Sequence, residues 1–402
     1  MRQLYLAATG QNRGKTTAAL GLFNGFVKSG LTTGFFKPVG QRTVIEEGVP
    51  AAEDAVLMKE TFGLPEPYPV MSPVHIPRGF TKAYIAGEVV EDLGARIRAA
   101  HATYTDHEML LIEGTGHAGV GAVIGLSNAV VASMLGTPAV IISEGGVGRP
   151  IDEIVLNAAL FAKQGVPVAG AIVNKVDLDA QPGITGILER GLARHGIPLL
   201  GVLPVRSLLS NPTLGMILEG VRGETIHPGP DLDRVIDGVA IGAMEAGHML
   251  ERVGPGTLVI VPGDREDVIL TLTTAHFASR LRKANASEAA RIAAVAAAAS
   301  NERTASTIGH EGAAIGLVLT GGYRPRGSVL DAIREADIFA TLVPEDTYVV
   351  ASEIHDLLVK THAADREKIA LIKALVDDHL DIDRILGVAR EAPVARPVPP
   401  AA

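Results

Sequence analysis

A short run near the start of the chain has residue types that could hold phosphate. Phosphate-binding loops usually read G-x-x-x-x-G-K-[ST], with lysine on the β/γ-phosphates and the hydroxyl on Mg²⁺. Gly14, Lys15 and Thr16 match the second half of this pattern, whereas Thr9 stands where the first glycine belongs and Gly10 comes one position late. A strand-to-helix turn here would aim backbone N–H groups at an anion. We predict a nucleotide site formed by Gly10, Gln11, Asn12, Arg13, Gly14, Lys15, Thr16 and Thr17.

Two carboxylates could hold the metal ion that accompanies a nucleotide, since Mg²⁺ usually takes one or two carboxylates in such sites. Glu113 ends the apolar run "LLIEG", and a charge at that point is hard to place in a core. Doubly wound sheets place ligand groups at such strand ends. Asp54 is a second candidate, and its alternative role is a helix N-cap. We predict that Thr16, Asp54 and Glu113 ligate Mg²⁺.

Polar residues follow two further apolar runs. Lys37 comes at the end of "TGFFK", where it would face the same crevice as Lys15; both lysines are therefore candidate catalytic residues. The alternative for Lys37 is a surface lysine whose stem covers apolar groups. "AIVNKVD" places Asn174 and Asp177 near a strand end, where they could contact the base. N-K-x-D is the guanine-reading pattern of GTPases, so this match leaves GTP open as the nucleotide; a polar turn is the alternative.

The elements that must position these residues are visible as an alternating pattern over residues 1–225. Apolar runs at 108–114, 138–146, 167–175 and 198–204 read as buried strands, and 16–29 reads as a helix that stops at Gly30. Strands buried on both faces and separated by helices indicate an α/β fold with a doubly wound, mostly parallel sheet. The uncharged run 122–143 is long enough for a membrane span. Its Gly136 and Pro138 favour a buried helix, a turn and a buried strand instead.

The second half of the chain predicts a smaller α/β domain. We expect a linker helix at 226–256 and then the second domain at 257–385. An alanine-rich insertion at 283–314 is expected to be a protruding helix or a mobile segment, because it has few large apolar residues. The Pro/Ala-rich tail at 386–402 is expected to be disordered.

Composition argues against several kinds of partner and several kinds of site. The 402 residues carry a formal charge of −9 without clustered basic residues, which argues against nucleic acid as a partner. The absence of cysteine excludes disulfides, thiolate zinc sites and a cysteine nucleophile. Because the N-terminus shows no signal-peptide pattern, we expect a soluble, cytoplasmic protein that has no contact with membranes.

These motifs together resemble the dethiobiotin synthetase-like (BioD-like) P-loop proteins. The shared features are the loop ending at Thr16, "KPV" with Lys37, an aspartate at Asp54, "EG-x-G" at Glu113 and the strand-end Asn174. The resemblance implies that the loop binds ATP, that Lys37 acts at the transferring phosphoryl group and that Asn174 contacts the base. "KPVGQR" and "EGTGH" depart from the dethiobiotin-forming members, so Gln41, Arg42 and His117 change the expected acceptor pocket.

The second half is similar to a DRTGG domain, through "GDRED" (263–267), "LTGG" (319–322) and "EDTYVVASEIH" (345–355). Both halves together are similar to the N-terminal region of long-form bacterial phosphotransacetylases. The resemblance implies a Mg²⁺-ATP-binding protein coupled to a DRTGG sensor domain, with a regulatory or slow ATPase role in acetyl-phosphate-related or cofactor metabolism. An ATP-dependent ligase that activates a carboxylate or carbamate is the alternative. We expect no phosphotransacetylase activity, and we expect the protein to be a homodimer. We also expect a small anionic metabolite to bind near Asp264 and Arg265. The alternative is that these two residues only pair with each other and fix a turn.

Overall fold

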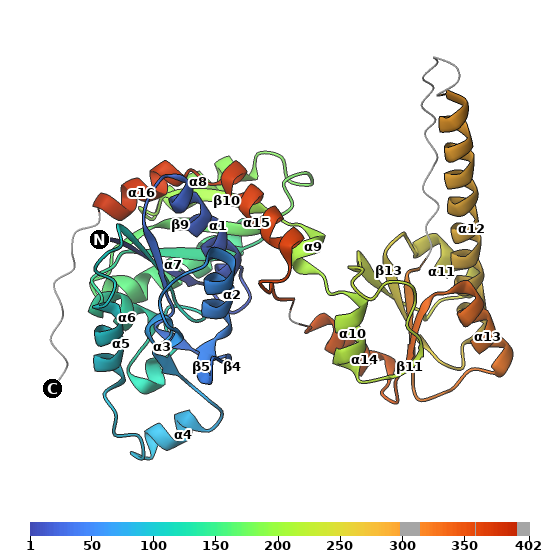
Figure 1. The fold of residues 1–402 in the computed structure, drawn as a ribbon, viewed down its shortest axis with the longest axis horizontal. Helices are drawn as coiled ribbons and strands as arrows, with labels where there is room; N and C mark the ends of the chain where they lie inside the picture. The colour runs from blue at the N-terminus through green and yellow to red at the C-terminus, as the bar shows by residue number, and fades with distance from the viewer. Residues whose placement is uncertain (298–313, 358, 392–402) are drawn as a thin grey trace. The chain divides into compact units, whose positions relative to one another are not determined.

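The computed structural model describes residues 1–297, 314–357 and 359–391. They form two compact units (Figure 1). The first contains Met1–Arg206 and the helices that follow Thr361, and the second contains Ser207–Lys360.

The first unit contains, in chain order, β1 Arg2–Ala8, α1 Lys15–Lys28, β2 Thr33–Phe36, β3 Val39–Gly40, β4 Thr43–Glu46, β5 Val49–Ala52, α2 Glu53–Phe62, α3 Tyr68–Met71, β6 Val74–His75, α4 Phe80–Ile85, α5 Leu93–His101, β7 Met109–Glu113, the 3-10 turn η1 Ala122–Ile124, α6 Asn128–Met134, β8 Ala139–Glu144, α7 Gly148–Lys163, β9 Val168–Val176, α8 Ile184–Ala193, β10 Leu199–Pro204, α15 Arg366–His379 and α16 Ile382–Glu391.

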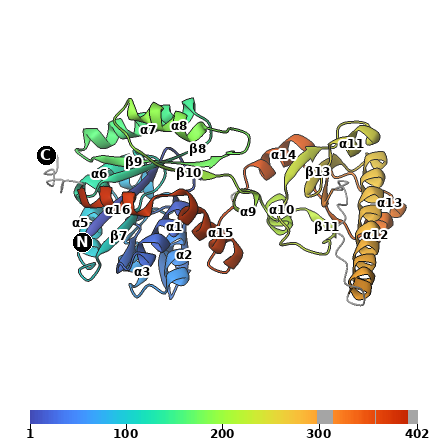
Figure 2. The same cartoon turned by 90° about the horizontal axis from the view of Figure 1, so that it is seen from above.

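The main sheet of this unit has, among the described residues, six parallel strands in the order β10-β9-β8-β1-β7-β2. Its central strands are apolar and buried on both faces, as parallel sheets require. Helices α1 and α15 lie on one face, and α7 and α8 lie on the other (Figure 2). This confirms the predicted doubly wound α/β fold. It also brings the carboxyl ends of β1, β7, β8 and β9 to one edge of the sheet.

The run 122–143 folds as predicted, into η1, α6 and strand β8. In the part of the chain that the structure describes, no helix combines the length and apolar character that crossing a membrane would need.

Two C-terminal helices complete the first unit, which corrects the prediction that residues up to 385 belong to the second domain. The buried face of α15 contains Ile369, Ile372, Leu375 and Val376. Gly21 and Gly25 on α1 allow close packing, because a Cβ at either position would collide with Val376 or Ile382. An ion pair between Lys28 and Asp377 lies beside this contact. The predicted disordered tail is also wrong at its start, since α16 extends to Glu391, and residues 392–402 lie outside the described residues.

The second unit contains α9 Ser207–Ser210, α10 Leu214–Val221, β11 Glu224–His227, β12 Gly238–Ile241, α11 Ala246–Arg252, β13 Thr257–Pro262, α12 Glu266–Ala297, β14 Gly316–Thr320, α13 Gly327–Ala336, β15 Phe339–Leu342 and α14 Thr347–His355.

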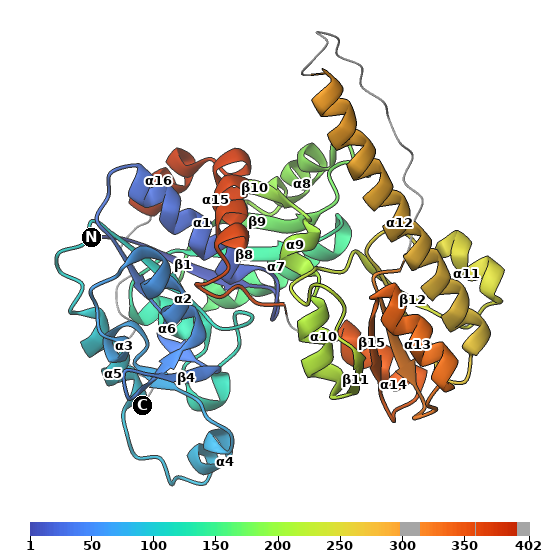
Figure 3. The ribbon, with the colours of Figure 1, turned by 45° about the vertical axis from the view of Figure 1, so that its right-hand side comes forward.

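Its sheet has the strand order β11-β15-β14-β13-β12 within the described residues, and only the edge strand β11 is antiparallel there. Helices α11, α12 and α13 pack on one face of the sheet, and α10 and α14 pack on the other (Figure 3). This confirms the predicted smaller α/β domain.

The boundaries within this half differ from the prediction. No linker helix spans 226–256, which instead contains strand β12 and the short helix α11. The cause is local, because Pro228, Pro230 and Gly238 interrupt any helix and an apolar strand follows them. Helix α12 continues into the alanine-rich segment as far as Ala297, while residues 298–313 lie outside the described residues.

Candidate functional site

The loop between β1 and α1 has the backbone geometry of an anion cradle. Two of its residues adopt positive φ, Asn12 at 58° and Gly14 at 89°. Alternation of left-handed and right-handed residues turns successive N–H groups toward one side. Neither Thr9 nor Gly10 has a positive φ. The missing first glycine therefore costs no backbone strain.

The first turn of α1 faces the same loop. Its first helical hydrogen bond runs from Ala18 N to Gly14 O (2.9 Å), so the N–H groups of Lys15, Thr16 and Thr17 have no acceptor within the helix. Lys15 is buried, and its Nζ lies 3.4 Å from Gly10 O. Burial, and then the nearby charge of Lys37, lowers the pKa of Lys15 to about 8. A phosphate bound here would meet both the helix N-terminus and this ammonium group.

Thr16 lies against the two predicted carboxylates. Its Oγ1 is 2.9 Å from Asp54 Oδ1 and 3.2 Å from Glu113 Oε1. A hydroxyl has one proton, so it donates to only one of them at a time. Glu113 comes from the end of β7 and Asp54 from the first turn of α2. The three predicted metal ligands are therefore adjacent, although they come from three separate segments.

Lys37 lies between these carboxylates and is 4% exposed. Its Nζ is 2.6 Å from Asp54 Oδ2, 3.0 Å from Glu113 Oε1 and 3.1 Å from Gly114 O. All three ammonium protons thus have acceptors. The alternative of a surface lysine is wrong, because the ammonium group itself is buried with the carboxylates.

The pKa shifts follow from this cluster. Burial, and then the charge of Asp54, raises the pKa of Glu113. Burial alone would also raise the pKa of Asp54, but the charge of Lys37 and hydrogen bonds from Lys37 and Thr16 lower it overall. Burial alone would lower the pKa of Lys37, but the charges of Asp54 and Glu113 raise it overall. At neutral pH Lys37 carries its proton and Asp54 is ionised.

The donor set fits a magnesium ion. Glu113 Oε2 is buried and has no hydrogen-bond partner among the described residues, an arrangement that costs free energy unless something binds there. The described residues contain no cluster of three or more His, Asp or Glu able to hold a metal unaided. Two carboxylates beside a hydroxyl suit Mg²⁺, which keeps waters and phosphate oxygens as ligands and uses one or two carboxylates.

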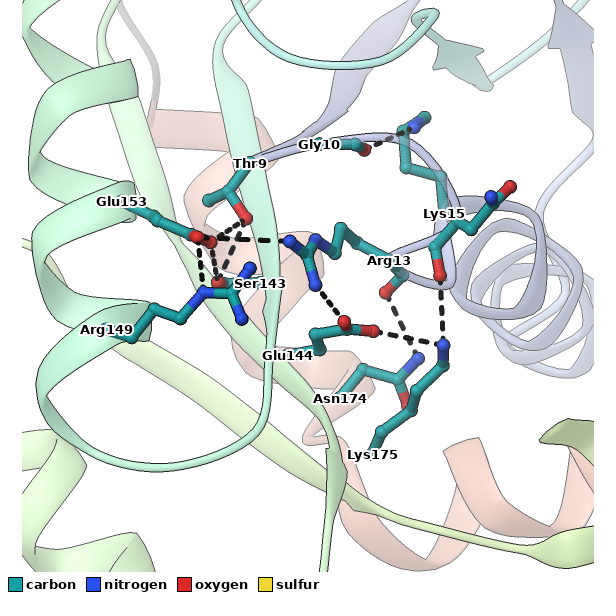
Figure 4. A network of polar contacts seen from close by, with 11 residues as sticks. Thr9, Gly10, Arg13, Lys15, Ser143, Glu144, Arg149, Glu153, Asn174 and Lys175 are labelled. Atoms are coloured by element: carbon teal, nitrogen blue, oxygen red, sulfur yellow. Dashed lines mark hydrogen bonds and ion pairs between the residues drawn. The ribbon is translucent and has the colours of Figure 1, made fainter. Parts of the chain in front are cut away.

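A second polar network holds the other side of the loop (Figure 4). Thr9 Oγ1 donates to Glu153 Oε2 (2.8 Å) and lies 3.0 Å from Ser143 Oγ. Arg149 Nε donates to Glu153 Oε1 at 2.7 Å. The hydroxyl in the place of the first glycine therefore anchors the loop to β8 and α7.

Arg13 is part of the same network. Its guanidinium group forms an ion pair with Glu144 and lies 3.9 Å from Glu153. Lys175 Nζ contacts Glu144 Oε2 at 3.0 Å and donates to Asn12 O at 3.0 Å. Asn174 Nδ2 donates to Arg13 O at 3.2 Å. These side chains come from the carboxyl ends of β8 and β9, from α7 or from the loop itself.

The structure thus brings together Lys15, Thr16, Lys37, Asp54 and Glu113, and it places Asn174 against the loop. Asp177 is exposed, and its Oδ1 accepts from Ala180 N (3.0 Å), as in a polar turn. Gln11 is exposed at the loop tip.

Sequence analysis missed the residues that hold the loop from the side, which are Thr9, Ser143, Glu144, Glu153 and Lys175. A signal existed for Glu144, because it ends an apolar strand in the same way as Glu113.

Hydrogen bonds also hold the segments that follow Lys37 and Glu113. Thr115 Oγ1 donates to Val39 O (2.6 Å), which ties the segment after Glu113 to the segment after Lys37. Asn128 Nδ2 donates to the carbonyl groups of Thr115 and His117, both at 2.7 Å. His117 is exposed, and so are Gln41 and Arg42.

Two family models match consecutive parts of the chain. A family model described as an AAA domain matches residues 2–213, and a model described as a DRTGG domain matches residues 216–357. The phosphate acetyltransferase of Nitratidesulfovibrio vulgaris is 25% identical over 399 residues, covering 94% of this chain and 50% of that protein. The phosphate acetyltransferase of Pseudomonas putida is 26% identical over 400 residues, covering 95% and 51%. The chain spans about half the length of the curated relatives it matches.

Solved structures show more distant similarity. The CBS and DRTGG domains of Clostridium perfringens pyrophosphatase, complexed with the activator diadenosine tetraphosphate, match at 19% identity and a TM-score of 0.26, covering 39% of this chain and 52% of that one. MinD of Pyrococcus horikoshii, complexed with Mg-ADP, matches at 12% identity and a TM-score of 0.32, covering 52% and 83%.

Proposed function

Because the chain belongs to the AAA domain family through residues 2–213 and carries a DRTGG domain at 216–357, we propose that it binds Mg²⁺-ATP in its first unit and uses it as a regulatory switch. The observation that carries the proposal is the cluster of Lys15, Thr16 and Glu113 around the first turn of α1. Lys15 and the helix N-terminus would bind the β- and γ-phosphates.

Magnesium would bind beside the phosphates, with Thr16, Asp54 and Glu113 as its protein partners. The unpartnered Glu113 Oε2 supports this role. The ion would bring positive charge to the phosphate oxygens. The protein side chains would hold the phosphate chain in position, exclude water from Lys37, and keep Glu113 close to the ion.

The test is calorimetric titration of Mg²⁺-ATP into the wild type and into Lys15→Ala. The matched control is Lys163→Ala, which removes an exposed lysine at the end of α7. We expect Lys15→Ala to lose at least tenfold in affinity and the control to bind as the wild type does. Equal affinity in all three proteins would overturn the phosphate site.

A ligase is the second candidate, and Lys37 is the observation that favours it. A lysine buried 3.0 Å from Glu113 is placed to neutralise charge on a phosphoryl group during transfer to a carboxylate or carbamate. Such catalysis is mainly positioning and electrostatic stabilisation. ADP release that depends on an added carboxylate or amine acceptor would favour the ligase over a switch.

The proposal for the second unit is that it binds a small anionic metabolite or nucleotide and changes ATP affinity. The carboxyl ends of β13, β14 and β15 meet there. At that edge Gly322 has space beside it, whereas the Tyr323 ring lies against Gly321. The alternative given for Arg265, a turn-fixing pair with Asp264, is not what the structure shows, because Arg265 pairs with Asp267. It donates to both oxygens of Asp267 at 2.9 Å and to Met244 O at 3.0 Å, so its main contacts hold this loop.

Coupling between two sites is typically ~1–3 kcal/mol and must be reciprocal. The relatives are named phosphate acetyltransferases, so acetyl phosphate and acetyl-CoA are the first ligands to test. ATP should be titrated with and without each ligand, and each ligand with and without ATP. If no ligand shifts ATP affinity, the sensor role is overturned while the nucleotide site stands.

A further inference from the structure

Two consecutive side chains at the end of β9 hold two consecutive carbonyl groups of the phosphate-binding loop. Asn174 Nδ2 donates to Arg13 O at 3.2 Å, and Lys175 Nζ donates to Asn12 O at 3.0 Å. The donors belong to the sequence N-K-V-D, in which asparagine and aspartate were expected to read the base. In this structure the asparagine amide is engaged with the loop backbone instead (Figure 4).

The direction of these carbonyl groups decides where the next N–H groups point. In a trans peptide the C=O and N–H bonds lie in one plane and point in opposite directions. Turning the carbonyl oxygens of Asn12 and Arg13 toward β9 therefore turns the N–H groups of Arg13 and Gly14 the other way. A carbonyl oxygen that faced a phosphate would repel it, whereas an N–H group attracts it.

Packing and charge hold this arrangement in place. Gly14 has φ +89°, and a Cβ at that position would overlap the Asn174 amide, so the amide lies directly against the glycine. Asn174 is buried at 6% exposure. Lys175 is fixed by Glu144, which also pairs with Arg13. One carboxylate thus connects the clamping lysine to the loop that it clamps.

We infer that Asn174 and Lys175 are positioning residues that clamp the backbone of the loop and so prepare its N–H groups for any polyphosphate, whatever base is attached. This inference deepens the proposed Mg²⁺-ATP site and rests on it. It separates the two parts of the N-K-V-D pattern, because the asparagine and lysine act on the phosphate side while Asp177 lies in an exposed turn.

A ligand without a base distinguishes clamping from base reading. Mg²⁺-tripolyphosphate, Mg²⁺-ATP and Mg²⁺-GTP should be titrated into the wild type, Asn174→Ala and Lys163→Met. If Asn174 is a clamp, Asn174→Ala loses affinity for all three ligands by a common factor of roughly tenfold, the usual effect of one lost hydrogen bond with its packing. The ratio of ATP to GTP affinity stays at its wild-type value.

Three further variants keep the result interpretable. Asn174→Leu keeps a similar volume without the amide donor, and it replaces Asn174→Ala if that variant melts before the titration temperature. Lys175→Arg keeps the charge, whereas Lys175→Met removes it. We expect Lys175→Arg to retain most of the tripolyphosphate affinity and Lys175→Met to lose about tenfold. Lys163→Met should match the wild type throughout.

The outcomes separate the clamp from the proposed function. Loss of ATP affinity in Asn174→Ala or Asn174→Leu with unchanged tripolyphosphate affinity would overturn the clamp and restore base reading, while the Mg²⁺-ATP site would stand. Failure of the wild type to bind any of the three ligands would overturn the proposed function and the clamp with it.

Discussion

The ammonium group of Lys37 lies 2.6 Å from a carboxylate oxygen of Asp54. The same ammonium group contacts Glu113, so one buried cation serves two carboxylates, of which Glu113 is buried and Asp54 is partly exposed. A magnesium ion bound to these carboxylates would compete with Lys37 for their oxygens. Lys37 is therefore expected to hold the two carboxylates together when no ion is bound. It is expected to move toward the phosphates when the ion binds.

Lys37→Met should destabilise the nucleotide-free protein by about 3–5 kcal/mol, because removing one partner of a buried ion pair leaves the other charges unpaired. Urea unfolding in the presence of a chelator measures this free energy. Mg²⁺ should restore part of the loss by taking the place of the ammonium group. A loss below ~1 kcal/mol, or one equal to that of Lys163→Met, would contradict the buried cluster.

Lys15→Met should raise stability at pH 7 while it removes nucleotide binding. The pKa of Lys15 is lowered from 10.5 to about 8, mainly by burial. Between these two values the unfolded chain holds more protons than the folded one, so wild-type stability rises with pH through this window. The penalty that the variant removes is about 3 kcal/mol below pH 8, at ~1.4 kcal/mol for each pKa unit.

The measurement is urea unfolding of both proteins from pH 7 to 10, without nucleotide. The difference between them should be largest at pH 7 and should shrink as the pH approaches 10.5. A difference that is absent at pH 7, or that grows with pH, would show that Lys15 is not a buried cation in the free protein.

Gly14→Ala should disrupt the loop. Alanine at φ +89° is strained by about 1–3 kcal/mol, and its Cβ would also displace the Asn174 amide. Both thermal stability and Mg²⁺-ATP affinity should fall. Gly148→Ala is the matched control, since that glycine begins α7 with ordinary φ and open space around it. The prediction fails if both variants bind ATP equally well.

ATP should bind more tightly than GTP, and Asp177→Ala should leave the ratio of the two affinities within about twofold. The carboxylate of Asp177 already accepts the Ala180 N–H and is exposed. Competition of each nucleotide against a labelled ATP measures the ratio. A selective loss of GTP affinity in Asp177→Ala would return the guanine-reading role to this residue.

The parts of the site predicted from sequence are those fixed by chain connectivity. Lys15 and Thr16 follow β1 directly, and Glu113 ends an apolar strand, so their common edge follows from the parallel sheet. The packing partners of a helix cannot be predicted in this way, because periodicity shows that one face of the helix is buried but not which element covers it. The apolar stripe of α15 was visible as Ile369, Ile372 and Val376, yet its contact with Gly21 depends on shape.

The network around Thr9 was unpredictable for a similar reason. A threonine in place of a glycine reads as a weaker match to the loop pattern, since the pattern assumes that the position needs a positive φ. In this chain the backbone does not need it, and the hydroxyl becomes an anchor to Glu153.

The chain leaves the first unit at Arg206 and returns to it at Thr361, so the DRTGG unit is an insertion between β10 and α15 of the first unit. Ending the chain at residue 225 would keep every predicted ligand residue but strip α15 and α16 from α1, the helix that begins with Lys15 and Thr16. In such a truncated protein the packing of α15 and α16 on α1 would be lost, and the resulting defect could be mistaken for an effect of losing the second unit. Excising 207–360 and joining the two ends with a flexible linker is the cleaner dissection. The same topology joins the inserted unit to the first unit by two segments of chain, one that follows β10 and one that precedes α15, the helix that packs on α1. A displacement of the inserted unit would therefore act on β10 or on α15.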